Sequence, residues 1–115
     1  MMHSMKLHSK PYELIKSGVK TIELRLNDEK RKAIKIGDEI EFVNSVHADL
    51  SLRCIVVGLH RFSSFEELYS RLPLLKCGYT ESDILLAKPS DMDLYYSKAE
   101  QDIYGVVGIE VELKA

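Results

Sequence analysis

The sequence lacks the features that identify several large classes of protein. No run of apolar residues approaches the roughly 20 that a membrane-spanning helix needs. The first residues contain no apolar segment of the kind found in secretion signals. No internal repeat, low-complexity segment or linker interrupts the chain. We therefore expect a cytoplasmic protein that does not associate with membranes.

Residues that bind metals are few and scattered. The two cysteines, Cys54 and Cys77, stand in unlike contexts, one inside an apolar strand pattern and one before a turn glycine. Their spacing indicates neither a metal site nor a disulfide framework, so we expect two reduced thiols. No His-x-Glu or Cys-x-x-Cys pattern supports zinc. The sequence therefore predicts no metal and no cofactor, and it leaves these histidines without a common role: His3, His8, His47 and His60.

Motifs of nucleophilic and phosphate-binding enzymes are also missing. The chain has no Gly-x-Ser-x-Gly segment and no phosphate-binding loop of the P-loop type. Its serines at Ser63, Ser64 and Ser97 precede helical patterns, and Ser64 and Ser97 are each followed three residues later by glutamate. This spacing is typical of helix N-terminal caps, so we interpret these serines as caps rather than nucleophiles.

The length and charge of the chain limit its possible partners. Its 115 residues fit one domain, which we expect to span residues 5–115, with Met5 as an alternative start and residues 1–4 as an overhang. Residues 1–38 carry nine Lys and Arg against five Asp and Glu, whereas residues 39–115 carry seven against thirteen. This distribution does not predict a broad basic surface for long duplexes, but it allows a local patch for one or a few phosphates.

The pattern of elements predicts an α+β fold. A helix is expected to open at Ser9-Lys10-Pro11, with Pro11 in its first turn, and to stop at Gly18. A turn is expected at 27–32, helices at 65–72 and 82–87, and a short helical turn after Ser97. The residues expected in strands are 3–8, 20–26, 39–43, 52–59 and 106–113. Because the strands do not alternate regularly with helices, we expect a small, mixed, mostly antiparallel β-barrel with helices covering its ends.

Three charged residues in the second expected strand form the strongest candidate site. Glu23 and Arg25 share one face, with α-carbons about 7 Å apart, while the opposite face is apolar. Lys20 has the wrong parity to join them by simple alternation, so its side chain must reach them through a bulge or its long stem. The grouping of Lys20, Glu23 and Arg25 predicts the floor of a polar cleft, although an exposed ion-pair network would show the same pattern.

These residues belong to a longer motif that resembles the ASCH domain family. The motif reads Gly18-x-Lys20-x-x-Glu23-x-Arg25-Leu26-x-Asp28-x-Lys30-Arg31, followed by Ile36-Gly37-Asp38-x-Ile40-x-Phe42. The segment Tyr95-Tyr96-Ser97-x-x-Glu100 with Tyr104-Gly105-Val106-Val107-Gly108-Ile109 resembles the end of a small bacterial single-domain branch of the family. The resemblance covers residues 5–113 and is weakest in the middle.

The resemblance implies a PUA-like β-barrel with a cleft lined by Lys20, Glu23 and Arg25, and binding of RNA or a nucleotide-like ligand. Some members of the family are acetylcytidine amidohydrolases, and some are reported to cleave RNA. The amidohydrolase branch shares the lysine but has threonine at the position of Glu23. It also uses a glutamate from the later helical region, for which this chain offers four candidates: Glu66, Glu67, Glu81 and Glu100.

Two further groups are candidates for ligand contact. The tyrosines Tyr95, Tyr96 and Tyr104 can stack on a base, or they can pack beside a helix cap. A basic run can attract phosphate at the rim of the cleft, or it can form an ordinary solvated loop. The run comprises Lys30, Arg31, Lys32 and Lys35.

The first hypothesis is a binding module for single-stranded RNA, a nucleotide or a modified nucleoside, with Lys20, Glu23, Arg25, Tyr96 and Tyr104 as ligand-binding residues. The alternative is a small hydrolase acting on a nucleoside amide or an RNA phosphodiester. In that case Lys20 would transfer protons and Glu23 would activate water or a hydroxyl. A third possibility is an interaction domain for an acidic peptide. The sequence does not indicate an oligomeric state.

Overall fold

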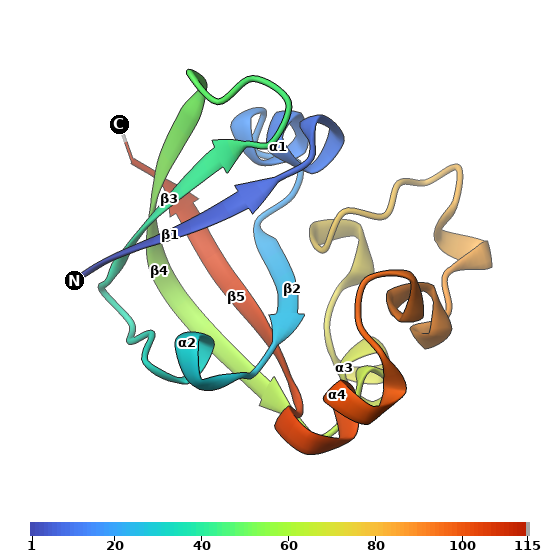
Figure 1. Ribbon diagram of the computed structural model, residues 1–115. Coiled ribbons are helices and arrows are strands. Elements are labelled where there is room, and N and C mark those ends of the chain that lie inside the picture. Colours follow the sequence, from blue (N-terminus) through green and yellow to red (C-terminus); the bar gives the residue numbers. More distant parts are fainter. Residues whose placement is uncertain (115) are drawn as a thin grey trace.

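The computed structural model describes residues 1–114, and these form one curled sheet with helices around it (Figure 1). The strands are β1 (Met2–Leu7), β2 (Ile22–Leu26), β3 (Glu39–Asn44), β4 (Ser51–Phe62) and β5 (Val106–Leu113). Their order in the sheet is β1-β3-β4-β5-β2. The β1–β3 pair is parallel and the other pairs are antiparallel, so the predicted mixed, mostly antiparallel sheet is confirmed.

The sheet is a half-barrel, because its edge strands β1 and β2 do not pair with each other along a ladder. We call the opening between these two strands the seam. One side-chain bond crosses it, from Arg25 Nη2 to the backbone oxygen of Lys6 at 2.8 Å. The seam therefore lies next to the charged residues of β2.

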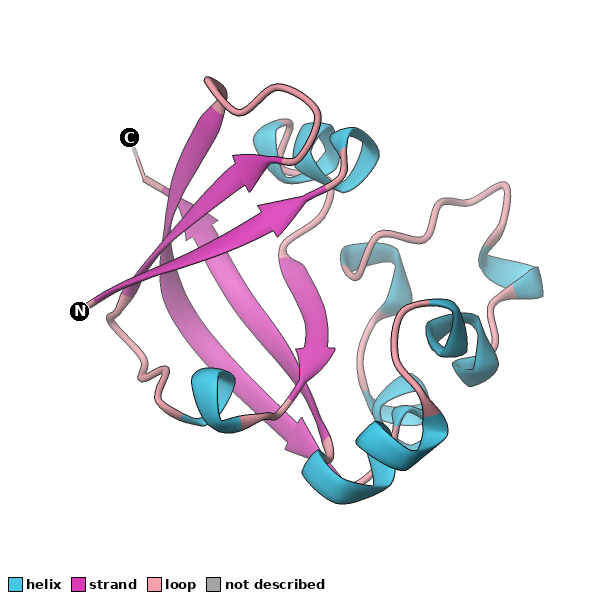
Figure 2. Ribbon diagram, viewed as in Figure 1, coloured by secondary structure: helices cyan, strands magenta, loops and turns pink. Residues whose placement is uncertain are grey.

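Four α-helices and three 3₁₀-helices surround the sheet in the described part of the chain. The α-helices are α1 (Ser9–Lys16), α2 (Glu29–Lys32), α3 (Phe65–Arg71) and α4 (Lys98–Tyr104). The 3₁₀-helices are η1 (Leu74–Lys76), η2 (Ile84–Leu86) and η3 (Pro89–Leu94). Residues 74–96, which we call the lobe, contain the three 3₁₀-helices and their connecting loops and lie beside β2 (Figure 2).

Local sequence signals explain most element boundaries. Ser64 and Ser97 accept hydrogen bonds from the backbone of α3 and α4, which confirms them as caps. Asp28 caps α2 in the same way, so the polar segment at 27–32 contains one helical turn. The helix expected at 82–87 is reduced to η2, and Pro89 begins η3 instead of only ending a helix. Proline at a first helical position loses no intrahelical bond.

The hydrophobic residues divide into two cores on opposite faces of the sheet. The first fills the half-barrel and includes Ile40, Phe42 and Cys54, all fully buried. The second lies outside β2, where Ile22 and Leu24 pack against α3 and the lobe. Strand β2 is therefore covered on both faces, and charged side chains on its inner face are shielded from water.

The N-terminus differs from the expectation. Strand β1 begins at Met2, one residue before the strand expected at 3–8, so residues 2–4, which the domain boundary at Met5 would make an overhang, belong to the sheet, where Met2 and His3 pair with Glu39 and Ile40 of β3. Hydrogen bonds to the backbone of β3, on the edge that β4 does not occupy, hold these residues in the sheet. Among residues 1–114, no helix is both long enough and apolar enough to span a bilayer.

Candidate functional site

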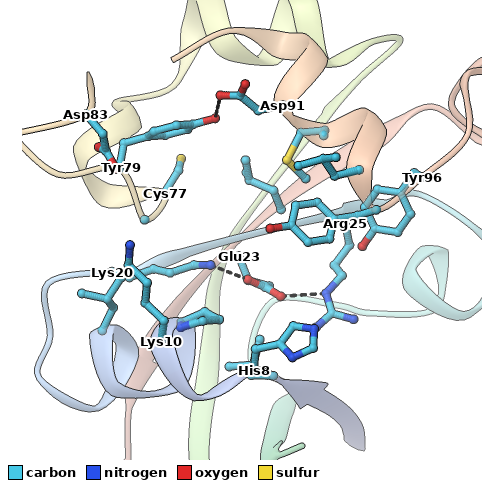
Figure 3. Close-up of a pocket in the computed structure, with 18 of the residues that line it drawn as sticks. His8, Lys10, Lys20, Glu23, Arg25, Cys77, Tyr79, Asp83, Asp91 and Tyr96 are labelled. Atoms are coloured by element: carbon cyan, nitrogen blue, oxygen red, sulfur yellow. Dashed lines mark hydrogen bonds and ion pairs between the residues drawn. The ribbon is translucent and has the colours of Figure 1, made fainter. Parts of the chain in front are cut away.

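A pocket of about 870 Å³ opens at the seam, between the half-barrel and the lobe (Figure 3). Its size falls within the usual range for small-molecule sites, about 300–1,000 Å³. The half-barrel side is formed by the end of β1, the start of α1 and the inner face of β2, and the other side by α3 and the lobe. The polar side chains used below are Lys6, His8, Lys10, Lys20, Glu23, Arg25, Tyr69, Tyr79, Asp83, Asp91, Tyr95 and Tyr96.

The three charged residues predicted from the motif meet at the floor of this pocket. Glu23 lies between the two cations: Lys20 Nζ is 2.7 Å from its Oε1, and Arg25 Nε is 2.7 Å from its Oε2. We call these residues the triad. Glu23 is only 5% exposed and Lys20 only 8%, so the triad is a buried ion cluster and not a solvated surface network.

Lys20 reaches Glu23 because it lies before the strand, where alternation does not apply. Strand β2 begins at Ile22, two residues later than predicted. Helix α1 ends through Gly18, whose φ of +84° suits glycine, and the backbone N–H of Lys20 then donates to Leu14 of the helix. This turn places the stem of Lys20 along Gly78 of the lobe, where a Cβ atom would lie 3.4 Å from Lys20 Cδ.

Arg25 bonds to Glu23 and also to the backbone of the opposite edge strand, across the seam. Its Nε donates to Glu23 and its Nη2 donates to the carbonyl oxygen of Lys6 in β1. The side chain is 15% exposed, and two of its five N–H donors are used inside the protein. The guanidinium therefore joins the two edge strands, and Arg25 is also one of the residues that line the pocket.

The charges of the triad support one another. Burial alone raises the pKa of Glu23, but the charges of Lys20 and Arg25 and their hydrogen bonds outweigh burial, so this pKa lies below its usual value. Burial lowers the pKa of Arg25, and the Glu23 carboxylate more than compensates, so the pKa of Arg25 is raised. Glu23 and Arg25 are therefore both ionised at neutral pH.

The lobe side of the pocket carries a chain of hydrogen bonds. Tyr79 donates its hydroxyl proton to Asp91 Oδ2 at 2.7 Å, and the Tyr69 and Tyr79 hydroxyls are 2.6 Å apart. Since the only proton of the Tyr79 hydroxyl goes to Asp91, Tyr69 must be the donor to Tyr79. Burial and these bonds raise the pKa of Tyr79 well above its usual value. The lobe side thus presents acceptors, to which Asp83 adds a carboxylate.

The half-barrel side carries two lysines and a histidine that are exposed to solvent. Lys6, His8 and Lys10 are exposed, and none of them forms an ion pair within residues 1–114. Figure 3 shows His8 and Lys10 on the side of the triad, facing Tyr79, Asp83 and Asp91 across the pocket. We call Lys6, His8 and Lys10 the rim. The pocket is therefore polarised, with donors on one side and acceptors on the other.

Of the three tyrosines predicted to contact a ligand, two line the pocket and one does not. Tyr96 lines the pocket and stacks on Phe65, with ring centroids 6.2 Å apart and planes at 15°. Tyr95 also lines it and is 64% exposed. Tyr104 lies in α4 and does not line the pocket, because that helix packs at the far end of β2. A base-stacking role is therefore open to Tyr95 and Tyr96 but not to Tyr104.

Two other groups of predicted residues lie away from the pocket. The basic run at 30–35 belongs to α2 and its following turn, where Arg31 pairs with Asp28 and Lys32 with Glu29. None of these four basic residues lines the pocket, because α2 and its following turn place them elsewhere on the fold. The late glutamates, which were candidates for the cleft, are exposed elsewhere on α3, α4 and the lobe: Glu66, Glu67, Glu81 and Glu100.

Several pocket residues were not predicted from the sequence: Lys6, His8, Lys10, Tyr69, Cys77, Tyr79, Asp83 and Asp91. Most of them belong to no recognisable sequence motif, because the fold brings them to the triad from distant positions. Lys10 alone stands beside a local signal, since it directly precedes Pro11, which marks the start of a helix. Burial raises the pKa of Cys77 to about 11, so it lines the pocket as a thiol and not as a reactive thiolate.

The half-barrel, the added helices and a polar pocket at the open side define a PUA-like domain. The chain belongs to the ASCH domain family: the model of the ASCH domain matches residues 5–115. This family generally resembles RNA-binding domains. The residues that the structure describes contain no group of three or more His, Cys, Asp or Glu placed to hold a metal ion.

Solved structures agree with this assignment. The hypothetical protein PH0355, a crystal structure, is 34% identical with a TM-score of 0.81, and the match covers 99% of this chain and 100% of that chain. Protein PF0455 from Pyrococcus furiosus, solved by NMR in solution, is 32% identical with a TM-score of 0.74, covering 98% and 97%. A mutant of ZmASCH from Zymomonas mobilis shares the fold, at 13% identity and a TM-score of 0.67, covering 96% and 67%. None of the curated proteins with which the sequence was compared matches it.

Proposed function

We propose that the protein binds single-stranded RNA or a nucleotide, with one nucleotide unit held in the pocket at the seam. The observation that carries this proposal is the buried triad at the floor of a pocket that also has open cations on one side and tyrosines on the other. A nucleotide combines the three chemistries that such a pocket can recognise: an anionic phosphate, a flat base and a polar base edge.

Each part of the pocket has a role in this proposal. The tyrosine rings of Tyr95 and Tyr96 stack on the base. Each oxygen of Glu23 accepts one bond from a cation and retains a second lone pair for a donor on the base edge, while Arg25 retains free N–H donors. The floor therefore reads a base edge by both a donor and an acceptor.

The same geometry favours binding over hydrolysis. Lys20 meets the pocket as a hydrogen-bond donor to Glu23, and Glu23 is bonded by two cations, which reduces its strength as a base. None of the four late glutamates lines the pocket to replace it. Incubation with an acylated cytidine and with short RNA tests the alternative directly, and turnover abolished by Lys20→Ala but not by Lys16→Ala would establish an enzyme.

Binding is tested by titrating the protein with the four 5′-mononucleotides and with a short single-stranded RNA, followed by NMR and calorimetry. We expect saturable binding, with resonance shifts confined to the pocket. Replacing Tyr95 by alanine removes a stacking surface and should weaken binding by about 1–3 kcal/mol. The control Leu85→Ala changes an exposed lobe residue outside the pocket and should not affect binding. If no nucleotide or RNA shifts the pocket resonances, the proposal is wrong.

A further inference from the structure

We propose that the rim of Lys6, His8 and Lys10 is a phosphate subsite, so that the preferred ligand is a phosphorylated nucleotide unit and not a free nucleoside. This inference rests on the proposed function, which it deepens by assigning the phosphate to a place distinct from the triad. The rim lies where β1 ends and α1 begins, at the open side of the pocket.

The triad is a poor place for a phosphate, although it contains two cations. Lys20 and Arg25 both bond Glu23 at 2.7 Å, and Arg25 also bonds the backbone of Lys6. A phosphate that reached either cation would come close to the buried Glu23 carboxylate, and the two anions would repel each other in a region of low dielectric. It would also have to compete for donors that are already used.

The rim has the opposite properties. Lys6, His8 and Lys10 are exposed, and none of the three is neutralised by an ion pair among residues 1–114. The Nδ1 atom of His8 lies 3.3 Å from Ser45 Oγ, which orients the ring and leaves Nε2 for a ligand. The two lysines are charged donors that keep their hydration in the free protein, so they can exchange water for phosphate oxygens without losing an internal partner.

The position of the rim relative to the floor is fixed. Arg25 donates to the backbone oxygen of Lys6 at 2.8 Å, which joins the end of β1 to the triad, and His8 and Lys10 follow Lys6 directly at the start of α1. On the other side of the pocket, Asp83 and Asp91 repel an anion. A nucleotide therefore enters with its phosphate toward the half-barrel and its base toward the tyrosines of the lobe.

The experiment compares nucleosides with their 5′-monophosphates, using cytidine against CMP and adenosine against AMP, on folded full-length protein. The variants are Lys10→Ala, Lys10→Arg, and His8→Gln combined with Lys10→Ala. The control is Lys16→Ala, which removes a lysine from the other end of α1, outside the pocket. Inorganic pyrophosphate is titrated separately as a probe of the phosphate site alone.

We expect each monophosphate to bind about tenfold or more tightly than its nucleoside, which is the effect of one charge-assisted bond. Lys10→Ala should remove about tenfold from monophosphate binding and leave nucleoside binding unchanged. The double variant should remove the preference, Lys10→Arg should keep it, and Lys16→Ala should behave as wild type. For a short RNA, the dependence of log K on log salt should become shallower by about 0.7 for each phosphate that the variant no longer neutralises.

The results distinguish a wrong phosphate subsite from a wrong proposed function. Equal affinity for nucleoside and monophosphate, or a preference that survives the double variant, would overturn the phosphate subsite and leave nucleotide binding intact. Pyrophosphate binding that is abolished by Lys10→Ala, together with no binding of any nucleoside or nucleotide, would support the subsite and overturn the proposed function. Absence of all binding would overturn both.

Discussion

The two sides of the pocket are built by different means. The half-barrel side rests on a regular sheet whose interior residues, such as Ile40, Phe42 and Val107, are fully buried. The lobe has no strand in the part of the chain that the structure describes, and its side chains Leu85, Leu86 and Leu94 are 94%, 79% and 85% exposed. Hydrophobic burial stabilises the first side much more than the second.

The lobe is held instead by polar contacts and a small core. Cys77 and Met92 pack into the second core outside β2, and the hydroxyl chain from Tyr69 through Tyr79 to Asp91 ties two of its turns to α3. Segments with few buried apolar contacts open locally at lower free energy than the sheet. The comparison indicates a fixed side, which carries the triad and the rim, facing an adaptable side, which carries Asp83, Asp91 and the aromatic rings.

The largest effect should follow from removing the carboxylate of the fixed side. Glu23→Gln leaves Lys20 and Arg25 buried without a neutralising charge, and loss of one partner from such a cluster costs about 3–5 kcal/mol. Unfolding in urea measures the loss. The control Glu13→Gln changes an exposed glutamate of α1 and should stay within about 0.5 kcal/mol of wild type.

An unchanged urea midpoint in Glu23→Gln would show that the triad does not stabilise the half-barrel. Nucleotide binding measured on the same variant tests a different point, namely whether Glu23 contacts the ligand. If the variant folds and loses nucleotide affinity, Glu23 contacts the ligand as proposed.

A smaller and local effect is expected on the adaptable side. Tyr79→Phe removes the donor to Asp91 and the acceptor for Tyr69, and unsatisfied polar groups of this kind cost about 1–3 kcal/mol each. Hydrogen exchange should lose protection in residues 74–96 while the strands keep theirs. Tyr95→Phe, at an exposed tyrosine, is the matched control. Equal loss of protection in lobe and strands would contradict the division into two sides.

The sequence predicted the triad on the fixed side better than the hydrogen-bonded residues of the lobe. Alternation along β2 is a local property, so it placed Glu23 and Arg25 on one face and the apolar residues on the other. The strand parity of Lys20 misled, because the turn that ends α1 sets its position before the strand begins. The sequence indicated two ways for Lys20 to reach Glu23, a bulge in the strand or the length of its side chain, and it did not indicate the turn that the structure uses.

The lobe could not be predicted in this way. Its 3₁₀-helices are three to six residues long, and such short pieces have little periodicity. The bond between Tyr79 and Asp91 and the packing of Gly78 beside Lys20 depend on the path of the chain between elements. Tyr104 shows the same limit: its motif neighbour Tyr96 lines the pocket, whereas α4 carries Tyr104 to another part of the fold.

The smallest effect concerns an edge of the half-barrel at low pH. Asp38 Oδ2 lies 2.8 Å from His3 Nε2 of β1 and also accepts the backbone N–H of Lys35, and these bonds lower the pKa of Asp38 to about 2. A carboxyl whose pKa is lower in the folded state stabilises the fold above its ordinary pKa of 3.8, and this stabilisation disappears as pH falls toward about 2. Urea midpoints measured between pH 5 and pH 2 should therefore fall less steeply for Asp38→Asn than for wild type. Parallel curves would mean that the pairing of β1 with β3, and not this carboxylate, holds the N-terminal strand against the half-barrel.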